Sequence, residues 1–178
     1  MVLLFNNFAL QFPGMKNYTG KFIISTKALS NTNLEKAVIF ITEDNEKGSI
    51  GFIINHLFPR QINGLVEFQQ SIPFPLYAGG PVATEGVFLL HRRPDIIEGG
   101  TPVVDSIYVG GSMQQAIAAI NKHQIGEQDI KLFIGYCGWD FGQLPDELAE
   151  GSWLMLDASV EKVFFSAAEL EWKQLLPE

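Results

Sequence analysis

The chain has 178 residues, of which 47% are hydrophobic and 12% aromatic, so it carries enough apolar surface for a sizeable core. Its formal net charge of −8, from 12 basic and 20 acidic residues, disfavours direct binding to nucleic acid or anionic lipid. The single cysteine excludes an internal disulfide and suits a reducing cytoplasm. No apolar run reaches the ~18 residues that a membrane span needs.

The N-terminal stretch MVLLFNNFALQF is apolar, but it contains Asn6-Asn7 and no basic leader, which makes it a poor signal peptide. The first strand-like segment follows at Gly20. We therefore expect residues 1–19 to be an N-terminal extension and residues 20–178 to form a single domain.

Runs of apolar, β-branched and aromatic residues predict a chain rich in strands. The expected strands are 20–25, 36–42, 49–55, 76–80, 86–92, 106–111, 130–136 and 153–156. Asp44, Asn45 and Gly48 lie between the second and third runs, and these residue types favour a tight turn. The sequence thus predicts an antiparallel hairpin there.

Helices are expected mainly late in the chain. Ser112 is a good N-cap for a helix whose apolar residues recur at helical spacing from Met113. Shorter helices are expected over 62–68 and 145–151. Ser166 and Glu169 have the spacing of a capping box, which predicts a C-terminal helix. Without regular βαβ alternation, this order indicates an α+β fold with a mixed, mostly antiparallel sheet and flanking helices.

No residue pattern identifies a catalytic site. Cys137 ends a predicted buried strand, where a free cysteine usually packs as a small hydrophobe. The three histidines, His56, His91 and His123, are scattered and form no ligand pair with the cysteine at metal-binding spacing. We therefore predict no metal, no cofactor and no assigned catalytic residue.

Two glycine pairs and one histidine are candidates for anion binding. Gly79-Gly80 and Gly110-Gly111-Ser112 could expose backbone amides, although neither matches a phosphate-binding fingerprint. His91 ends a predicted strand and precedes two arginines, so it could bind a carboxylate or phosphate. The alternatives are chain bends at the glycines and a histidine paired with the backbone.

Several segments together resemble the YqgE/AlgH family of small bacterial proteins. They are GKFIIS (20–25), AVIFITEDNEKGSIGFIIN (37–55), YAGGPV (77–82), FLLH (88–91) and GYCGWDFGQLPDEL (135–148), with Trp153 after them. The resemblance runs from about Gly20 to the C-terminal helix. It implies one α+β domain whose sheet is split and curled into a partial barrel. It supplies no catalytic residues, and the name of one branch implies a regulator of transcription.

The segment from Gly135 to Gln143 is interpreted first as a packed corner of the fold. Trp139 beside Gln143, bounded by Gly138, could also line a recognition groove. We expect a non-enzymatic cytoplasmic binding or regulatory domain that acts through a protein or small-molecule partner. The alternatives are an enzyme or anion-binding protein using His91 with the amides near Gly79-Gly80 and Gly138, and a DNA-binding regulator, which the net charge disfavours. The oligomeric state is not predicted.

Overall fold

The structure is a computed structural model that describes residues 16–165, 167 and 170–176. Nine strands form one sheet in the order β6-β7-β5-β8-β3-β2-β1-β9, with β4 paired to β8 off this path. Their bounds are β1 Lys21–Ser25, β2 Val38–Asn45, β3 Gly48–Ile53, β4 Leu76–Ala78, β5 Val82–His91, β6 Thr101–Val104, β7 Ile107–Val109, β8 Ile130–Asp140 and β9 Trp153–Asp157.

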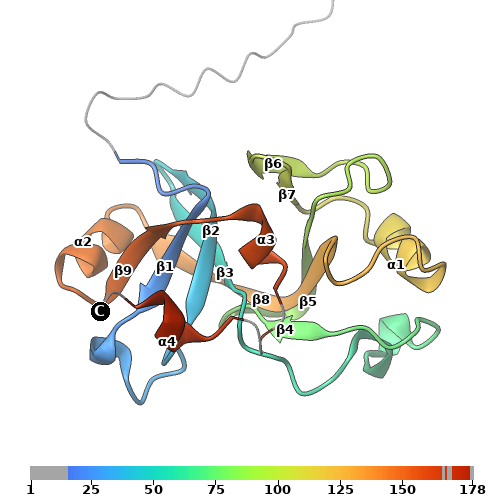
Figure 1. Cartoon of the computed structure of the whole chain (residues 1–178), viewed down its shortest axis with the longest axis horizontal. Coiled ribbons are helices and arrows are strands. Elements are labelled where there is room, and N and C mark those ends of the chain that lie inside the picture. The colour runs from blue at the N-terminus through green and yellow to red at the C-terminus, as the bar shows by residue number, and fades with distance from the viewer. Residues whose placement is uncertain (1–15, 166, 168–169, 177–178) are drawn as a thin grey trace, which may run out of the picture.

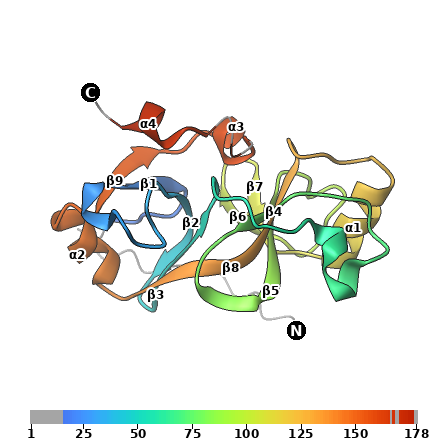
Figure 2. The same cartoon turned by 90° about the horizontal axis from the view of Figure 1, so that it is seen from below.

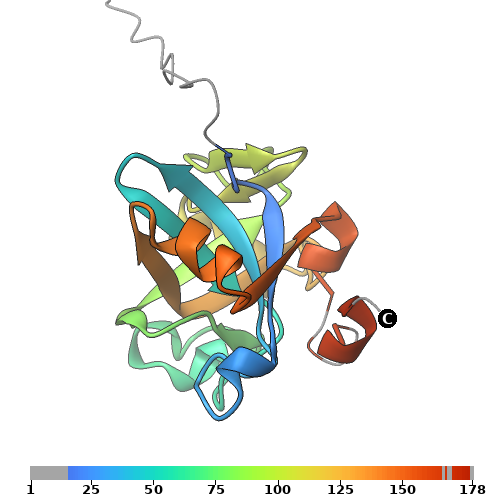
Figure 3. The ribbon, with the colours of Figure 1, turned by 90° about the vertical axis from the view of Figure 1, so that its left-hand side faces the viewer.

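The sheet is antiparallel except for the parallel pair β4–β8. It curls without closing, because β6 and β9 end the order as separate edges (Figure 3). The predicted α+β class, with a mixed and mostly antiparallel sheet curled into a partial barrel, is therefore confirmed. The hairpin expected between β2 and β3 also forms.

Strand β8 joins the two halves of the molecule (Figures 1 and 2). Residues 130–136 pair with β5, and residues 137–140 pair with β3. The strand is thus longer than the predicted 130–136. The chain bends at Gly135, whose φ is +68°, and then continues as a strand through Trp139. The expected corner is therefore a bend inside one strand that belongs to both halves.

The helices are α1 (Met113–Asn121), α2 (Gln143–Ala149), α3 (Val160–Val163) and α4 (Trp172–Leu175). Ser112 caps α1 as predicted, because its hydroxyl accepts the Gln115 N–H at 3.2 Å. The expected helix over 62–68 is instead two 3-10 turns, Ile62–Gly64 and Val66–Phe68. Helix α2 begins two residues before the predicted Pro145.

Helix α4 lies within the C-terminal helix expected after Ser166, and α3 precedes that segment. The residues between them that the structure describes, including Leu170 and Glu171, are not helical, and the predicted caps Ser166 and Glu169 lie outside the described residues. Tertiary contacts hold this segment in place. Leu170 is buried in the core, and the Trp172 indole donates to the Ser25 carbonyl at 2.8 Å. Tertiary packing thus supports this segment, as it does most helices in proteins.

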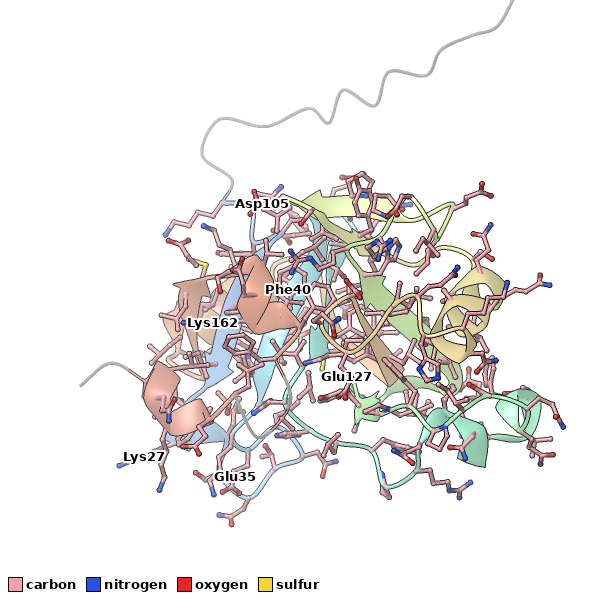
Figure 4. All side chains as sticks on the ribbon, turned by 45° about the vertical axis from the view of Figure 1, so that its right-hand side comes forward. Lys27, Glu35, Phe40, Asp105, Glu127 and Lys162 are labelled. Atoms are coloured by element: carbon pink, nitrogen blue, oxygen red, sulfur yellow. The ribbon has the colours of Figure 1, made fainter. Side chains whose placement is uncertain are left out.

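Three apolar clusters make up the core. The first packs one face of the sheet against the C-terminal segment and includes Phe40, which Figure 4 labels beside α3. The second lies under α1. The third, on the opposite face of β2 and β3, holds Cys137, Trp139 and Trp153 beside α2. Tyr18 also packs into the third cluster, so contacts with the fold begin before Gly20.

Candidate functional site

The glycine pair Gly79-Gly80 carries the chain across β8 at very close range. Strands β4 and β5 both pair with residues 132–134 of β8, so they lie on its two opposite edges. A Cβ on Gly79 would lie 2.4 Å from the Gly135 oxygen, and one on Gly80 would lie 2.1 Å from the Tyr136 carbonyl carbon. A Cβ on Gly135 would lie 2.3 Å from the Gly80 oxygen. The crossing therefore requires a glycine at each of these three positions.

His91 is enclosed by the fold. Its ring is fully buried and stacks on Tyr108 with the ring centroids 5.6 Å apart. Its Nδ1 accepts the Arg93 N–H at 3.2 Å, and among the described residues its Nε2 has no hydrogen-bond partner of normal geometry. Burial lowers the pKa of His91, and the backbone of Gly110 opposes this shift in part. A neutral, enclosed imidazole offers no charge to an anion.

Cys137 is also buried, with 4% of its surface exposed. Its Sγ donates to the Gly79 oxygen at 3.5 Å. Burial raises the pKa of this thiol to about 12, so the thiolate is not formed near neutral pH. The geometry agrees with a packing role for this side chain.

A second polar cluster gathers around Glu147 of α2. The indole N–H groups of Trp139 and Trp153 donate to its Oε2 at 2.9 and 2.8 Å. The two indoles meet edge to face with ring centroids 6.1 Å apart. Gln143 donates to Oε1 of Glu147 at 3.1 Å, and its own Oε1 accepts the Asp140 N–H at 3.0 Å. This carboxylate fixes α2 against the ends of β8 and β9.

A groove of about 300 Å³ lies over the ends of β2, β3 and β8. This volume is at the lower end of the range of ligand sites. Its lining residues are Glu43, Asn45, Lys47, Gly48, Ser49, Ile50, Val82, Tyr136, Gly138, Trp139 and Asp140. The groove thus combines charged groups, apolar side chains and backbone.

The floor of the groove is one face of three neighbouring strands. In register, Glu43 pairs with Ile50 and Ile50 pairs with Gly138; the next row is Asn45, Gly48 and Asp140. Side chains alternate between the faces of a strand, so these two rows share a face. The glycine at 138 leaves part of this floor without a side chain, whereas a Cβ at Gly48 would lie 2.0 Å from the Trp139 oxygen.

Trp139 contributes to the groove through its backbone. Because Gly138 and Asp140 face the groove, the intervening Trp139 points to the opposite face, where its ring packs in the cluster beside α2. Its indole N–H is bound to Glu147 on that side. The Trp139 ring therefore does not face the groove, where the sequence suggested that it would contact a ligand.

Gly138 differs from the other glycines of this region, because the fold does not require it. A Cβ built there would meet only Tyr136, at an ordinary 3.7 Å, and its φ is not left-handed. The position is exposed. A glycine inside a strand lowers stability relative to alanine, and it often marks a place where a ligand or another backbone approaches closely.

The structure brings together only three of the six residues predicted to bind a ligand. Gly138, Trp139 and Gln143 lie at the end of β8 and the start of α2. His91 pairs with Ile130 at the far end of β8.

The backbone at Gly79 has partners of its own: its N–H donates to Ile134 at 2.8 Å, and its oxygen accepts the Ile53 N–H at 2.9 Å. Gly80 belongs to the same crossing. An anion site that uses His91 with the amides of Gly79, Gly80 and Gly138 is therefore not formed.

Sequence reasoning missed the other groove residues and the role of Glu147. Glu43, Ile50 and Asp140 join the site only through register across three strands. The position of Glu147 carried a signal, because it lies four residues after Gln143 on one helix and between two tryptophans that each need an acceptor. The described residues contain no group of three His, Cys, Asp or Glu side chains that could hold a metal.

The profile of a family described as AlgH-like matches residues 22–178. UPF0301 proteins of Chlorobaculum tepidum and Chlorobium limicola are 37% and 36% identical to this chain over 155 residues, covering 87% of it and 83% of each relative. The solution structure of the AlgH protein from Pseudomonas aeruginosa matches with a TM-score of 0.68 at 25% identity, over 86% of both chains.

A crystal structure from Corynebacterium diphtheriae matches with a TM-score of 0.71, covering 90% of this chain and 86% of that one. At 17% identity this likeness concerns the fold alone. No helix within the described residues combines the length and the apolar character needed to cross a bilayer.

Proposed function

This chain belongs to the AlgH-like family, and we propose that it is a non-enzymatic cytoplasmic binding domain whose partner, a protein or a small molecule, docks in the groove over Gly138. The observation that carries the proposal is the glycine at 138. It lowers the stability of a strand and opens the floor of a groove, although nothing in the packing forbids a side chain. A binding role explains that cost, because a ligand can reach the floor of the groove.

The chemistry of the buried groups supports binding over catalysis. The thiol of Cys137 has a pKa of about 12, which removes it as a nucleophile near neutral pH. The imidazole of His91 is enclosed and lies away from the groove. Any influence on transcription acts through a partner, since a net charge of −8 opposes contact with DNA phosphates.

Nuclear magnetic resonance on the isotope-labelled full chain tests this proposal, with a library of small fragments as the probe. We expect fragment-induced shifts at the amides of Ile50, Tyr136 and Gly138. The variant Gly138→Val should lose them, because its side chain fills the floor. The matched control is Gly64→Val, at an exposed glycine without left-handed φ whose Cβ would make an ordinary 3.5 Å contact.

Shifts that cluster away from the groove, or that persist unchanged in Gly138→Val, would contradict the proposal. Turnover of any hydrolase or transferase substrate in a panel would also contradict the proposal, if a substitution in the groove abolished that turnover.

A further inference from the structure

The end of β8 presents an open edge beside the groove. On one side, residues 137–140 pair with β3. On the other side, the pairing with β5 stops at Tyr136, which lies opposite Val82. Within the described part of the chain, no strand pairs with the outer side of Gly138 and Asp140. The ladder of β5 therefore ends where the groove begins.

Two hydrogen bonds fix which backbone groups face that edge. The Asp140 N–H is accepted by Gln143, so at this residue the backbone turns away from β3. The Ile50 carbonyl, opposite Gly138, accepts the Thr42 hydroxyl at 3.3 Å and so points toward β2. In an antiparallel ladder, pairs that exchange hydrogen bonds alternate with pairs that do not. The N–H and C=O of Gly138 therefore point outward together, as a donor and an acceptor.

This arrangement of a donor, an acceptor and an open strand edge suits another extended backbone. We infer that the groove takes a short extended segment of a partner protein, which pairs with Gly138 and continues the β5 ladder toward Asp140. This inference rests on the function proposed above and names the class of partner. Adding a strand to a sheet edge is a recurrent way for domains to bind peptides. The side chain of Gln143 closes the edge at Asp140, so the pairing covers only a few residues.

The surroundings favour a protein segment with a basic residue. The carboxylates of Glu43 and Asp140 line the groove, and among the described residues neither is in an ion pair. Lys47 is the single cation of the lining, and the whole chain carries a net charge of −8. Val82 lines the groove and is 39% exposed. An exposed apolar side chain beside the open strand edge suits a polypeptide partner.

The test is selection from a displayed library of random 12-residue linear peptides against the immobilised full chain, with removal of peptides that bind the immobilisation support alone. We expect enriched sequences with a basic residue. A synthetic peptide from the selection should bind wild type and Gly64→Val equally, and Gly138→Val at least tenfold more weakly. N-methylation of the peptide amide that pairs with Gly138 should weaken binding more than tenfold, whereas methylation of the next amide should not.

Charge reversal provides a second line of evidence that does not depend on Gly138. Asp140→Lys should weaken the selected peptide severalfold, and the effect should shrink in high salt. Selected peptides that bind Gly138→Val as tightly as wild type, or that tolerate N-methylation at every amide, would overturn the inference. Failure to enrich any peptide while fragments still shift the groove amides would overturn it and leave the proposed binding function standing.

Discussion

Trp139 and Trp153 share one acceptor, since both indole N–H groups donate to Oε2 of Glu147, at 2.9 and 2.8 Å. Both indoles are buried, with 7% and 1% of their surfaces exposed. The shared carboxylate connects α2 to β8 and β9, which follow one another in the sequence but are separated by β3, β2 and β1 in the sheet. The carboxylate therefore holds the end of β8 from the face opposite the groove.

Removing this acceptor leaves two buried donors unsatisfied. We expect Glu147→Ala to lower the free energy of unfolding by about 2–4 kcal/mol and Glu147→Gln to lower it by less, because the amide oxygen still accepts. Urea denaturation measures both. The control Glu150→Ala, at the exposed residue that follows this helix, should stay within about 0.5 kcal/mol of wild type. Equal effects at 147 and 150 would contradict this role of Glu147.

The crossing of the chain over β8 makes Gly135 intolerant of a side chain. Alanine there would need a left-handed φ of +68° and would place its Cβ 2.3 Å from the Gly80 oxygen. We expect Gly135→Ala to lower the free energy of unfolding by roughly 2–4 kcal/mol. Thermal and urea denaturation measure the loss. A variant as stable as wild type would show that the crossing is not a constraint.

Gly138, three positions later in the same strand, should behave in the opposite way. Gly138→Ala is expected to raise the free energy of unfolding by about 0.5–1 kcal/mol, because alanine loses less backbone entropy in a strand and meets no close neighbour. The same denaturation experiments compare it with Gly135→Ala. A loss of more than about 1 kcal/mol at 138 would mean that the fold, and not a ligand, requires this glycine.

The buried thiol of Cys137 should resist alkylation. We expect iodoacetamide at neutral pH to modify the unfolded chain only, as intact mass would show. The unfolded thiol, with an ordinary pKa of 9.0, loses its proton before the folded one, whose pKa is about 12. Between these values the unfolded state binds fewer protons, so stability falls as pH rises.

The variant Cys137→Ala removes that contribution. Above pH ~9 the free energy of unfolding of the variant should fall less steeply with pH than that of wild type. The two slopes should differ by up to about 1.4 kcal/mol per pH unit. Rapid labelling of the native protein, or identical alkaline slopes, would contradict the buried state of this thiol.

His91 gives a prediction on the acid side. Burial lowers its pKa below the ordinary 6.5, so on acidification the unfolded imidazole takes up a proton first. The contribution of His91 to stability is therefore present at neutral pH and falls as pH drops below about 6.5. Assigned imidazole resonances should titrate with a midpoint below that value. A midpoint at or above it would indicate a solvated or paired ring.

Local patterns predicted those parts of the fold that depend on neighbours in the sequence. The turn at Asp44 to Gly48 and the cap at Ser112 form as expected, because their hydrogen bonds are local. The C-terminal helix expected after Ser166 is present as α4, while Leu170 is buried in the core and the Trp172 indole is bound to Ser25, contacts that no local pattern encodes. The family resemblance supplied the curl of the sheet, which no local pattern encodes.

The candidate site could be predicted only in part. The sequence alone did not distinguish Gly138 from Gly79, Gly80 and Gly135. The structure does, because the crossing over β8 requires glycine at those three positions and not at 138. Trp139 suggested a recognition surface, yet alternation along β8 turns its ring to the other face. Glu43 and Ile50 reach the groove through strand pairing, which single residues do not reveal.

The groove over Gly138 is the binding site that we propose for this domain. Crystals of the wild-type chain soaked with the fragment library test this proposal. We predict difference density in contact with Ile50, Tyr136 and the backbone of Gly138. Density that fills only other parts of the surface, with the groove empty, would contradict it.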